Sequence, residues 1–178
     1  RYFFHDPNLT RLDDGTLLVA APQWSRAGWN AGHRCLRILR SDDGGQTWQQ
    51  LQTLPLEEGT PFVLDGQLLM FVQETSRRDF QIVSSDDGGR TWTPPKTVIE
   101  GPVWNISTAR VALPETLYWA MDYDLPNQKH NGKVMVRLDR KMSPLDPKAW
   151  SLSNVVHPPE LPAALTRNTG SDGPQSPG

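Results

Sequence analysis

The sequence predicts an all-β protein, a β-propeller built of four-stranded antiparallel blades, of which about three are present. The string SDDGGQTW at 41–48 returns as SDDGGRTW at 85–92, and internal repetition of this kind is typical of blade-like architectures. Each copy occupies the same place in a matching order of strands and turns. The composition agrees, since seven Trp, 14 Gly and 16 Pro suit short strands joined by turns better than long helices.

The first unit covers residues 5–54. HDPNLTRLDDGTLLVAAPQW predicts two strands around an Asp-Gly turn, because Asp-Gly between apolar runs is a strong hairpin signal. The loop SRAGWNAGHR follows, then the strand CLRILR, the repeated turn and the strand WQQLQTL. Four strands in this order form one antiparallel meander.

Two further units repeat this order, at 58–100 and 104–156. The second has a hairpin around Asp65-Gly66, the loop ETSRRD, the strand FQIVS, the repeated turn and the strand KTVIE. The third unit matches less well. RKMSPLDPKAW stands in place of the repeated turn, and Trp150 takes the place of Trp48 and Trp92. Residues 1–157 are therefore predicted to hold the blades. The Gly/Ser/Pro-rich remainder, 158–178, is expected to be a linker or a disordered end.

The repeated string has a structural explanation. Its Ser and Asp side chains can bond nearby backbone N–H groups, as in Asx-type and Ser-type turns. Its glycines supply the positive φ angles of a tight reversal. The Thr begins the next strand, and Trp48 or Trp92 is predicted to bury its ring between neighbouring sheets.

The composition excludes several classes of partner. The formal net charge is −2 and no block of like charge runs along the chain, which argues against nucleic acid or a membrane surface. The single cysteine, Cys35, is expected to be a small buried hydrophobe. No second His or Cys stands at metal spacing from His33, so no metal is expected, and no cofactor is implied. The chain begins at Arg1 rather than Met, which predicts that its natural start is missing.

The two repeated strings are similar to the Asp-box, or BNR repeat, of the sialidase superfamily, and HDPNLTRLDDGTLLVA resembles the first inner strand of the same proteins. The resemblance covers about residues 5–156. It implies a six-bladed propeller, present here as an N-terminal three-blade portion or a divergent member, and a secreted or periplasmic location. The structural Asp-box residues that it implies are Ser41, Asp43, Gly45, Thr47, Trp48, Ser85, Asp87, Gly89, Thr91 and Trp92.

The resemblance also implies an arginine triad for a substrate carboxylate, an Asp acid/base and a Tyr nucleophile, a recognised departure from the two-carboxylate scheme. The sequence differs from this pattern at two places. The family's Arg-Ile-Pro is His5-Asp6-Pro7 here, and the loop SRAGWNAGHR holds no carboxylate. These differences argue against the standard sialidase mechanism and against an anionic sugar held in the usual way.

Blade geometry predicts where a site lies. The loops that enter strand one and join strands two and three share one rim, and the repeated turn faces the other. Aromatic, Arg, Asn and His side chains on the first rim suit a sugar, because rings stack on it and polar groups bond its hydroxyls. The predicted catalytic residues are Asp6, Glu74, Asp122 and Tyr123, and the predicted substrate-binding residues are His5, Trp24, Arg26, Trp29, Asn30, His33, Arg34 and Arg77. Glu57-Glu58 lie on the same predicted rim.

Simpler roles stay open at this point. Asp6 can serve a local turn, Asp122 and Tyr123 can cap a strand end, and polar loops occur in any globular protein. We expect Glu74, Asp122 and the His5-Asp6 pair to point toward a common concavity, with Glu74 as an acid/base.

Two functions follow from these readings. One is an exo-acting sialidase-like glycoside hydrolase that removes terminal sugars. The alternative is a non-catalytic propeller module that binds glycans or proteins. The expected partners are a carbohydrate and either the remaining blades of a longer chain or a second copy that closes the propeller as a homodimer.

Overall fold

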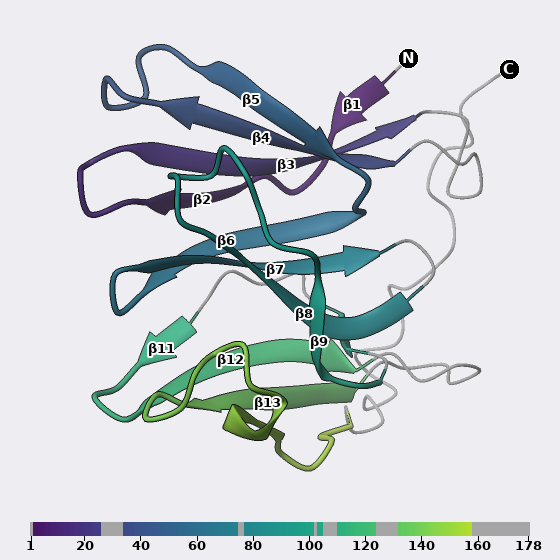
Figure 1. Ribbon diagram of the computed structural model, residues 1–178. Helices are drawn as coiled ribbons and strands as arrows, with labels where there is room; N and C mark the ends of the chain where they lie inside the picture. The colour runs from purple at the N-terminus through teal and green to yellow at the C-terminus, as the bar shows by residue number, and fades with distance from the viewer. Residues whose placement is uncertain are drawn as a thin grey trace, which may run out of the picture.

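Three antiparallel sheets stand side by side in the computed structural model (Figure 1), which describes residues 2–25, 34–74, 77–101, 103–104, 110–123 and 132–157. Their order along the chain is their order in space, as in successive propeller blades. The predicted all-β class is therefore confirmed. No helix in this part of the chain has the length and apolar character needed to cross a bilayer.

Blade 1 consists of β1 to β5, and its inner strand is in two pieces. Its strands are β1 (Tyr2–Phe4), β2 (Asn8–Arg11), β3 (Leu17–Ser25), β4 (Cys35–Ser41) and β5 (Gln49–Leu54). Both β1 and β2 pair with β3, so the predicted first strand is broken at residues 5–7. Pro7 explains the break, because it has no N–H for the ladder and restricts the residue before it.

Blades 2 and 3 repeat the same order. Blade 2 has β6 (Glu58–Leu64), β7 (Gln67–Glu74), β8 (Arg77–Ser85) and β9 (Lys96–Ile99). Blade 3 has β10 (Val103–Trp104), β11 (Arg110–Ala112), β12 (Thr116–Tyr123), β13 (Gly132–Asp139), the short 3-10 helix η1 (Pro147–Ala149) and β14 (Trp150–Leu152). The loop predicted at 74–79 is shorter than expected, because Glu74 pairs with Arg77 and β8 begins there.

The core fills the two spaces between the blades. Between blades 1 and 2, Leu18, Ala20, Leu36 and Ile38 pack against Leu68, Met70, Val72 and Val83. Between blades 2 and 3, the ring of Trp119 packs edge-on against Phe62 and Phe80, with ring centroids 5.4 and 5.8 Å apart. Alternate residues of β7 therefore enter different cores, and both faces of blade 2 are covered.

The two SDDGG turns, residues 41–48 and 85–92, hold themselves by side-chain bonds. In the first, the Gly45 N–H donates to Ser41 Oγ at 2.8 Å, and Thr47 donates to Asp43 through both N–H and Oγ1 at 2.9 and 2.6 Å. The second repeats every one of these bonds with Ser85, Asp87, Gly89 and Thr91. Two glycines in each turn have positive φ angles, so the turn chemistry predicted from the sequence is confirmed.

The burial predicted for the equivalent tryptophans holds only where a preceding blade exists. Trp150 is 7 % exposed and packs in the core between blades 2 and 3, and Trp92 packs against the core between blades 1 and 2. For Trp48 the prediction was wrong: its ring is 42 % exposed. Blade 1 has no described blade before it, so its indole lies on Gly45 at an open face and donates to the Gly45 carbonyl at 3.1 Å.

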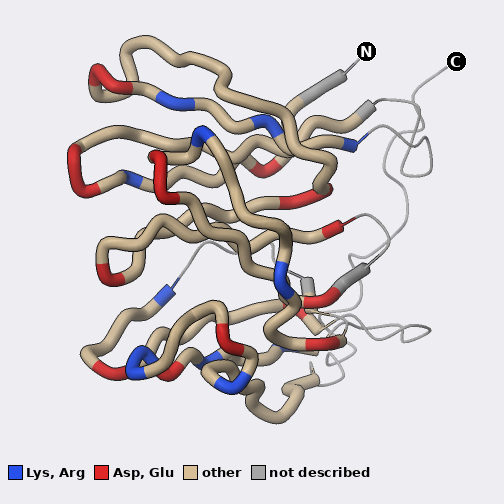
Figure 2. The backbone as a smooth tube through the Cα atoms, in the orientation of Figure 1, with Lys and Arg blue, Asp and Glu red and all other residues tan. Residues whose placement is uncertain are grey.

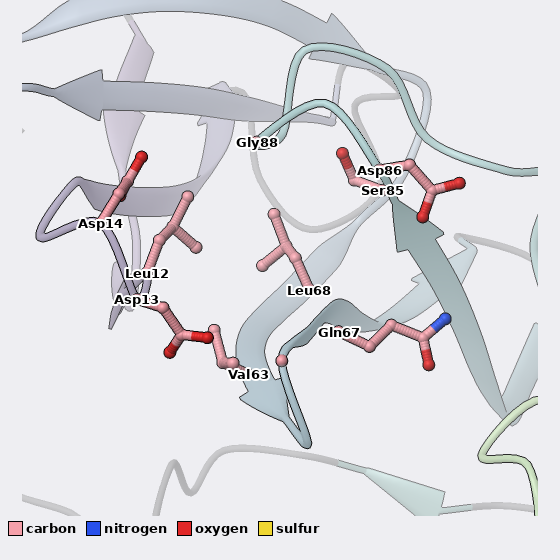
Figure 3. A pocket seen from close by; sticks show the side chains of 10 residues that line it. Leu12, Asp13, Asp14, Val63, Gln67, Leu68, Ser85, Asp86 and Gly88 are labelled. Atoms are coloured by element: carbon pink, nitrogen blue, oxygen red, sulfur yellow. The ribbon is translucent and has the colours of Figure 1, made fainter.

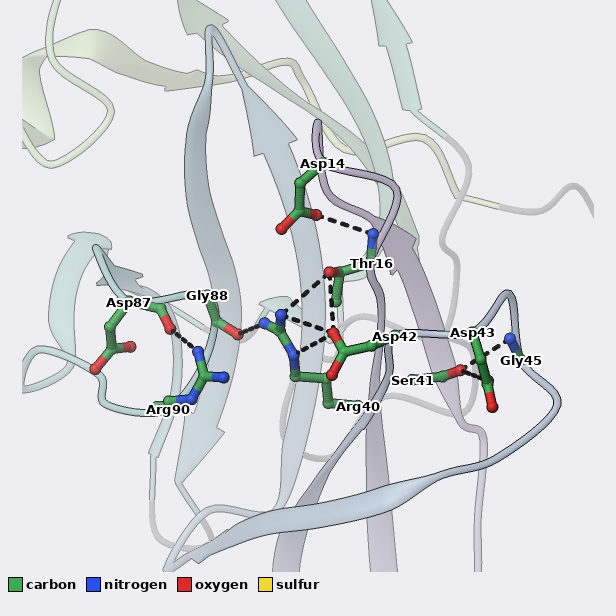
Figure 4. Close-up of polar contacts among 10 residues, drawn as sticks. All are labelled: Asp14, Thr16, Arg40, Ser41, Asp42, Asp43, Gly45, Asp87, Gly88 and Arg90. Atoms are coloured by element: carbon green, nitrogen blue, oxygen red, sulfur yellow. Dashed lines mark hydrogen bonds and ion pairs between the residues drawn. The ribbon is translucent and has the colours of Figure 1, made fainter.

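Arg40 joins blade 1 to the SDDGG turn of blade 2 (Figure 4). Its guanidinium donates to the Gly88 carbonyl at 3.0 Å and to Thr16 Oγ1 at 3.1 Å. Asp42 completes the arrangement, because its Oδ1 lies 2.8 Å from Arg40 Nε. We call Thr16, Arg40 and Asp42 the arginine clip. Thr16 and Arg40 are buried, whereas Asp42 is exposed, so the clip joins the two blades through a buried guanidinium.

Acid should weaken the SDDGG turns. Hydrogen bonds, above all from the Thr91 hydroxyl, lower the pKa of Asp87 to about 2. The folded state thus favours the ionised carboxylate, and the stabilisation present above the ordinary value is lost as pH falls from about 4 to about 2. In urea titrations the destabilisation caused by Asp87→Asn should therefore shrink over that range. Asp86→Asn is the matched control, and equal pH dependence in both variants would contradict the expectation.

Candidate functional site

The ends of the blades form two rims of different chemistry. The SDDGG turns and the short hairpin turns lie at one end, and the C-terminal ends of β3, β7 and β12 lie at the other (Figure 1). We call these the turn rim and the loop rim. Acidic residues occur at both ends of the blades (Figure 2), and at the turn rim Asp43 and Asp87 bond within the SDDGG turns. The loop rim holds the residues predicted to form a site.

The break between β1 and β2 places an aspartate at the loop rim in an unusual backbone conformation. Asp6 has φ of 35°, a left-handed value that non-glycine residues adopt rarely and that is common at functional sites. The His5 N–H donates to the Pro22 carbonyl at 2.9 Å, and Asn8 Nδ2 donates to the Asp6 carbonyl at 3.2 Å. His5 Nδ1 lies 2.9 Å from Asp6 Oδ2. The corner therefore fixes the direction of the Asp6 carboxylate.

Two buried glutamates begin blade 2 beside this corner. Glu57 and Glu58 are 4 % and 5 % exposed, which is rare for carboxylates. The Glu57 N–H donates to the Gln73 carbonyl at 2.8 Å, and its side chain forms an ion pair with Arg34 of blade 1. The strand that follows, EGTPFVL, is otherwise buried and apolar. Its core contacts therefore hold the glutamates in place.

The carboxyl group of Glu58 favours its protonated form. Burial first, and then the negative charge of Asp6, raise its pKa to about 8, while the positive charge of Arg34 opposes the shift. A negative charge at Asp6 favours the protonated form of Glu58. We call Asp6, Glu57 and Glu58 the carboxylate cluster, a name for their common place at the start of blade 2: Glu57 pairs with Arg34, and the charge of Asp6 acts on Glu58. It combines an acid with a carboxylate, the pair that acid/base chemistry requires.

Aromatic and basic side chains cover one side of the cluster. The His5 and Trp24 rings are stacked, with centroids 4.4 Å apart and planes 10° apart. The Arg34 guanidinium lies 4.8 Å from the Trp24 ring centroid. Because Arg34 also pairs with Glu57, it links this layer to the start of β6. His5, Trp24 and Arg34, all predicted as substrate-binding residues, thus lie around the cluster.

The remaining predicted catalytic residues have other surroundings, although Glu74 follows Gln73, which pairs with Glu58 in the sheet. Glu74 lines an apolar pocket of about 310 Å³ together with Leu54, Pro55, Leu56, Val83, Trp92, Thr93, Pro94 and Pro95. Asp122 pairs with Lys133. Tyr123 packs against the core between blades 2 and 3. Strand alternation directs adjacent residues to opposite faces, so β12 does not bring Asp122 and Tyr123 together.

Several predicted residues cannot be placed. Arg26, Trp29, Asn30 and His33 lie outside the described residues, as does the 158–178 tail. Arg77 has a described backbone, in β8, but its side chain is outside the description. Within the described ranges, no group of three or more His, Cys, Asp or Glu side chains is arranged to hold a metal.

A second cavity lies on the turn rim between blades 1 and 2 (Figure 3). It measures about 320 Å³ and is lined by Leu12, Asp13, Asp14, Val63, Gly66, Gln67, Leu68, Ser85, Asp86 and Gly88. The Thr16 N–H donates to Asp14 Oδ1 at 2.9 Å and lowers the Asp14 pKa. This cavity, unlike the carboxylate cluster, lies beside turns that the fold needs, and Asp14 at its edge bonds within one of them.

The close approach of blade 2 to blade 1 at the cluster requires a glycine. A Cβ at Gly59 would lie 2.3 Å from Leu36 Cδ2 and 3.0 Å from Met70 Sδ. We therefore expect Gly59→Ala to push β6 outward and to lower the free energy of unfolding by about 1–3 kcal/mol, as overpacked cores do. Denaturant unfolding measures this. Gly44→Ala, where a Cβ meets no neighbour but φ is +73°, separates crowding from backbone strain. Unchanged stability in Gly59→Ala would contradict the tight contact.

Solved structures share this fold. A structure of an α-L-arabinofuranosidase from Lactobacillus brevis matches with a TM-score of 0.62 and 12 % identity over 83 % of this chain and 53 % of that one. A GH93 α-L-arabinofuranosidase of Fusarium graminearum, solved with arabinobiose, matches with a TM-score of 0.56 and 21 % identity over 86 % and 48 %. The Hadza microbial sialidase Hz136 matches with a TM-score of 0.51 and 19 % identity over 88 % and 34 %.

These likenesses are confined to the fold. At such identities they do not transfer an activity. The chain spans about half the length of the two arabinofuranosidases and about a third of the sialidase. The sequence matches no family model and no curated protein.

Proposed function

We propose that this chain carries the acid/base half of a glycoside hydrolase that removes a terminal neutral sugar. The observation that carries the proposal is Glu58, a buried carboxyl with a pKa of about 8 beside the Asp6 carboxylate. Support also comes from the fold, which is shared with structures named as arabinofuranosidases and a sialidase. Most glycosidases use one protonated and one ionised carboxyl group at the scissile bond.

In the proposed reaction, Glu58 gives its proton to the glycosidic oxygen as the bond to the anomeric carbon breaks. The Asp6 carboxylate stabilises the positive charge that develops on the sugar. Water then adds to the anomeric carbon and releases a proton to Asp6, from which it returns to Glu58. Glu57 takes no part in this cycle, because its ion pair with Arg34 holds its side chain in place.

A neutral substrate fits the charges better than sialic acid does. The cluster holds three carboxyl groups, and its one described arginine, Arg34, is engaged by Glu57 and Trp24. The Asp-box resemblance of the SDDGG turns does not change this inference, because those turns lie on the opposite rim. A furanoside such as an α-L-arabinofuranoside is the substrate class that we favour.

A purely glycan-binding module is the second candidate. It would require an open aromatic surface, since such sites stack sugars on exposed rings. Trp24 is only 6 % exposed and lies against His5, an arrangement that suits support of the carboxylates better. The hydrolase is therefore the stronger proposal.

A panel of fluorogenic aryl glycosides tests the function. We expect turnover of the α-L-arabinofuranoside, little turnover of the α-sialoside, and a loss of kcat/KM above about pH 8 as Glu58 ionises. Absence of turnover on every glycoside between about pH 5 and pH 9, with calorimetry showing glycan binding, would replace the hydrolase by the binding module.

A further inference from the structure

Blade 1 and blade 3 each have one sheet face that no described sheet covers. The open face of blade 1 is the one that would contact a preceding blade, and the open face of blade 3 is the one that would contact a following blade. Blade 2 has neighbours on both sides, so it shows what each kind of face looks like when it is packed. Blades 1 and 3 stand at the two ends of the row (Figure 1). Comparing them with blade 2 tells what their open faces are built to contact.

Strand pairing aligns the three blades. Leu17 pairs with Ser41 and Leu68 pairs with Ser85, which places the first two blades in the same register relative to the SDDGG turns. Leu117 is buried against the preceding blade as Leu68 is, and it pairs with Leu138. The three blades can therefore be aligned residue by residue, and equivalent positions can be compared.

The open face of blade 1 is built for a preceding blade. Leu9 and Trp48 on this face are 56 % and 42 % exposed. Their equivalents in blade 2 are Pro61, which pairs with buried Met70 as Leu9 pairs with Val19, and Trp92. Trp92 packs against the core that blade 1 shares with blade 2. An apolar sheet face of this kind marks an interaction surface.

The open face of blade 3 is built for a following blade. Val111 and Met135 on this face are 60 % and 39 % exposed. Val111 corresponds to Phe62 and Met135 to Ile82, and both of these blade 2 residues are buried in the core shared with blade 3. The two open faces are therefore complementary in type: each presents the side that the other lacks.

Polar groups identify the partner more sharply. In blade 1, the arginine clip binds the Gly88 carbonyl in the SDDGG turn of the next blade. Blade 3 carries the same three residue types at the equivalent places, Thr116, Arg137 and Asp139, since Tyr118 pairs with Arg137 as Leu18 pairs with Arg40. Blade 3 is thus equipped to bind another SDDGG turn.

The pattern in blade 2 supports this pairing of clip and turn. At the position of Arg40 and Arg137, blade 2 has Ser84. The next blade, blade 3, has RKMSPLDPKAW in place of the SDDGG turn. The clip arginine is thus present where an SDDGG turn follows and absent where none does. The SDDGG turn at 41–48 lies beside the open face of blade 1 and has no described clip opposite it.

We infer that a second copy of this chain is the partner, and that two copies close into one ring of six blades. Blade 3 of each copy packs on blade 1 of the other, with Arg137 donating to the partner's Gly44 carbonyl as Arg40 donates to Gly88 within the chain. Three blades correspond to about half the length of the two arabinofuranosidase structures that share the fold, which is consistent with this closure. Both carboxylate clusters then lie on one rim, related by the two-fold axis.

Sedimentation equilibrium over about 1–100 µM protein tests the ring. We expect twice the chain mass of 20.0 kDa. Arg137→Glu and Leu9→Asp change a half-buried and an exposed position on the two open faces, and each should raise the dimer dissociation constant at least about tenfold. Lys96→Glu, on the outer strand of blade 2, is the matched control and should leave it unchanged. Circular dichroism verifies that each variant keeps its β-sheet.

Mixing the two interface variants gives a sharper test. In the homodimer of either variant, both contacts between the copies carry the substitution. In a mixed dimer, one contact is intact, because it joins the Leu9 face of the Arg137→Glu variant to the Arg137 face of the Leu9→Asp variant. We therefore expect mixing to restore dimers. A folded wild-type monomer at every concentration, a dimer insensitive to both variants, or open assemblies larger than a dimer would each overturn the inference.

Discussion

Replacing Glu58 by Gln should abolish most of the turnover. The amide keeps the shape of the side chain but has no acidic proton, so we expect kcat/KM to fall by about 10²- to 10⁴-fold, the usual contribution of general acid catalysis. The loss should be smaller for aryl glycosides with acidic leaving groups, because these depart without full protonation. Steady-state kinetics on two leaving groups measures both effects.

Stability separates this catalytic role from a structural one. Because burial raises the Glu58 pKa to about 8, the folded state holds a proton that the unfolded chain releases above its ordinary pKa. The stabilisation by protonated Glu58 is complete below that ordinary value, and the free energy of unfolding should fall as pH rises toward about 8. Glu58→Gln should remove this slope. Asp13→Asn, on the turn rim, is the control for both measurements, and a Gln variant with wild-type turnover would eliminate Glu58 as the acid.

Truncation of Trp119 to Ala should produce the largest loss of stability in the chain. The side chain is 1 % exposed and meets the rings of Phe62, Phe71 and Phe80. The Arg110 guanidinium also lies 5.1 Å from its ring centroid. Removal of a buried indole leaves a cavity between blades 2 and 3, which costs about 3–5 kcal/mol.

Chemical denaturation with tryptophan fluorescence and circular dichroism measures that cost. Leu113→Ala, at a position 46 % exposed on the turn rim, is the control and should change the free energy of unfolding by less than about 1 kcal/mol. If Trp119→Ala lost no more than this control, the space between blades 2 and 3 would have to be filled by other side chains.

Local chemistry made the blades predictable. The SDDGG turns are held by bonds among their own residues, and the Asp-Gly hairpins depend on adjacent residues. A few consecutive residues are therefore enough to predict the conformation of each turn. Trp48 and Trp92 show where this stops. Both lie in the same local sequence, but Trp48 is exposed whereas Trp92 packs against a core. The difference arises because blade 1 precedes Trp92, and no described blade precedes Trp48.

The carboxylate cluster could not be predicted in the same way, because it is formed by residues far apart in the sequence. Glu57 and Glu58 were recognised as rim residues, yet their importance comes from burial against blade 1, from Arg34, and from Asp6, which lies about 50 positions earlier in the sequence. Two acidic residues that open an otherwise apolar strand were the available signal. Glu74 and Asp122 also follow apolar runs, but β7 and β12 carry them to other surroundings.

The arginine clip recognises a peptide carbonyl rather than a side chain. The acceptor position still requires glycine, because Gly88 has a φ of +71° and a Cβ there would lie 2.6 Å from Arg40 Nη1. A blade can therefore receive the clip only if it brings a glycine turn to that place, whereas the side chains around the turn are not read by the arginine.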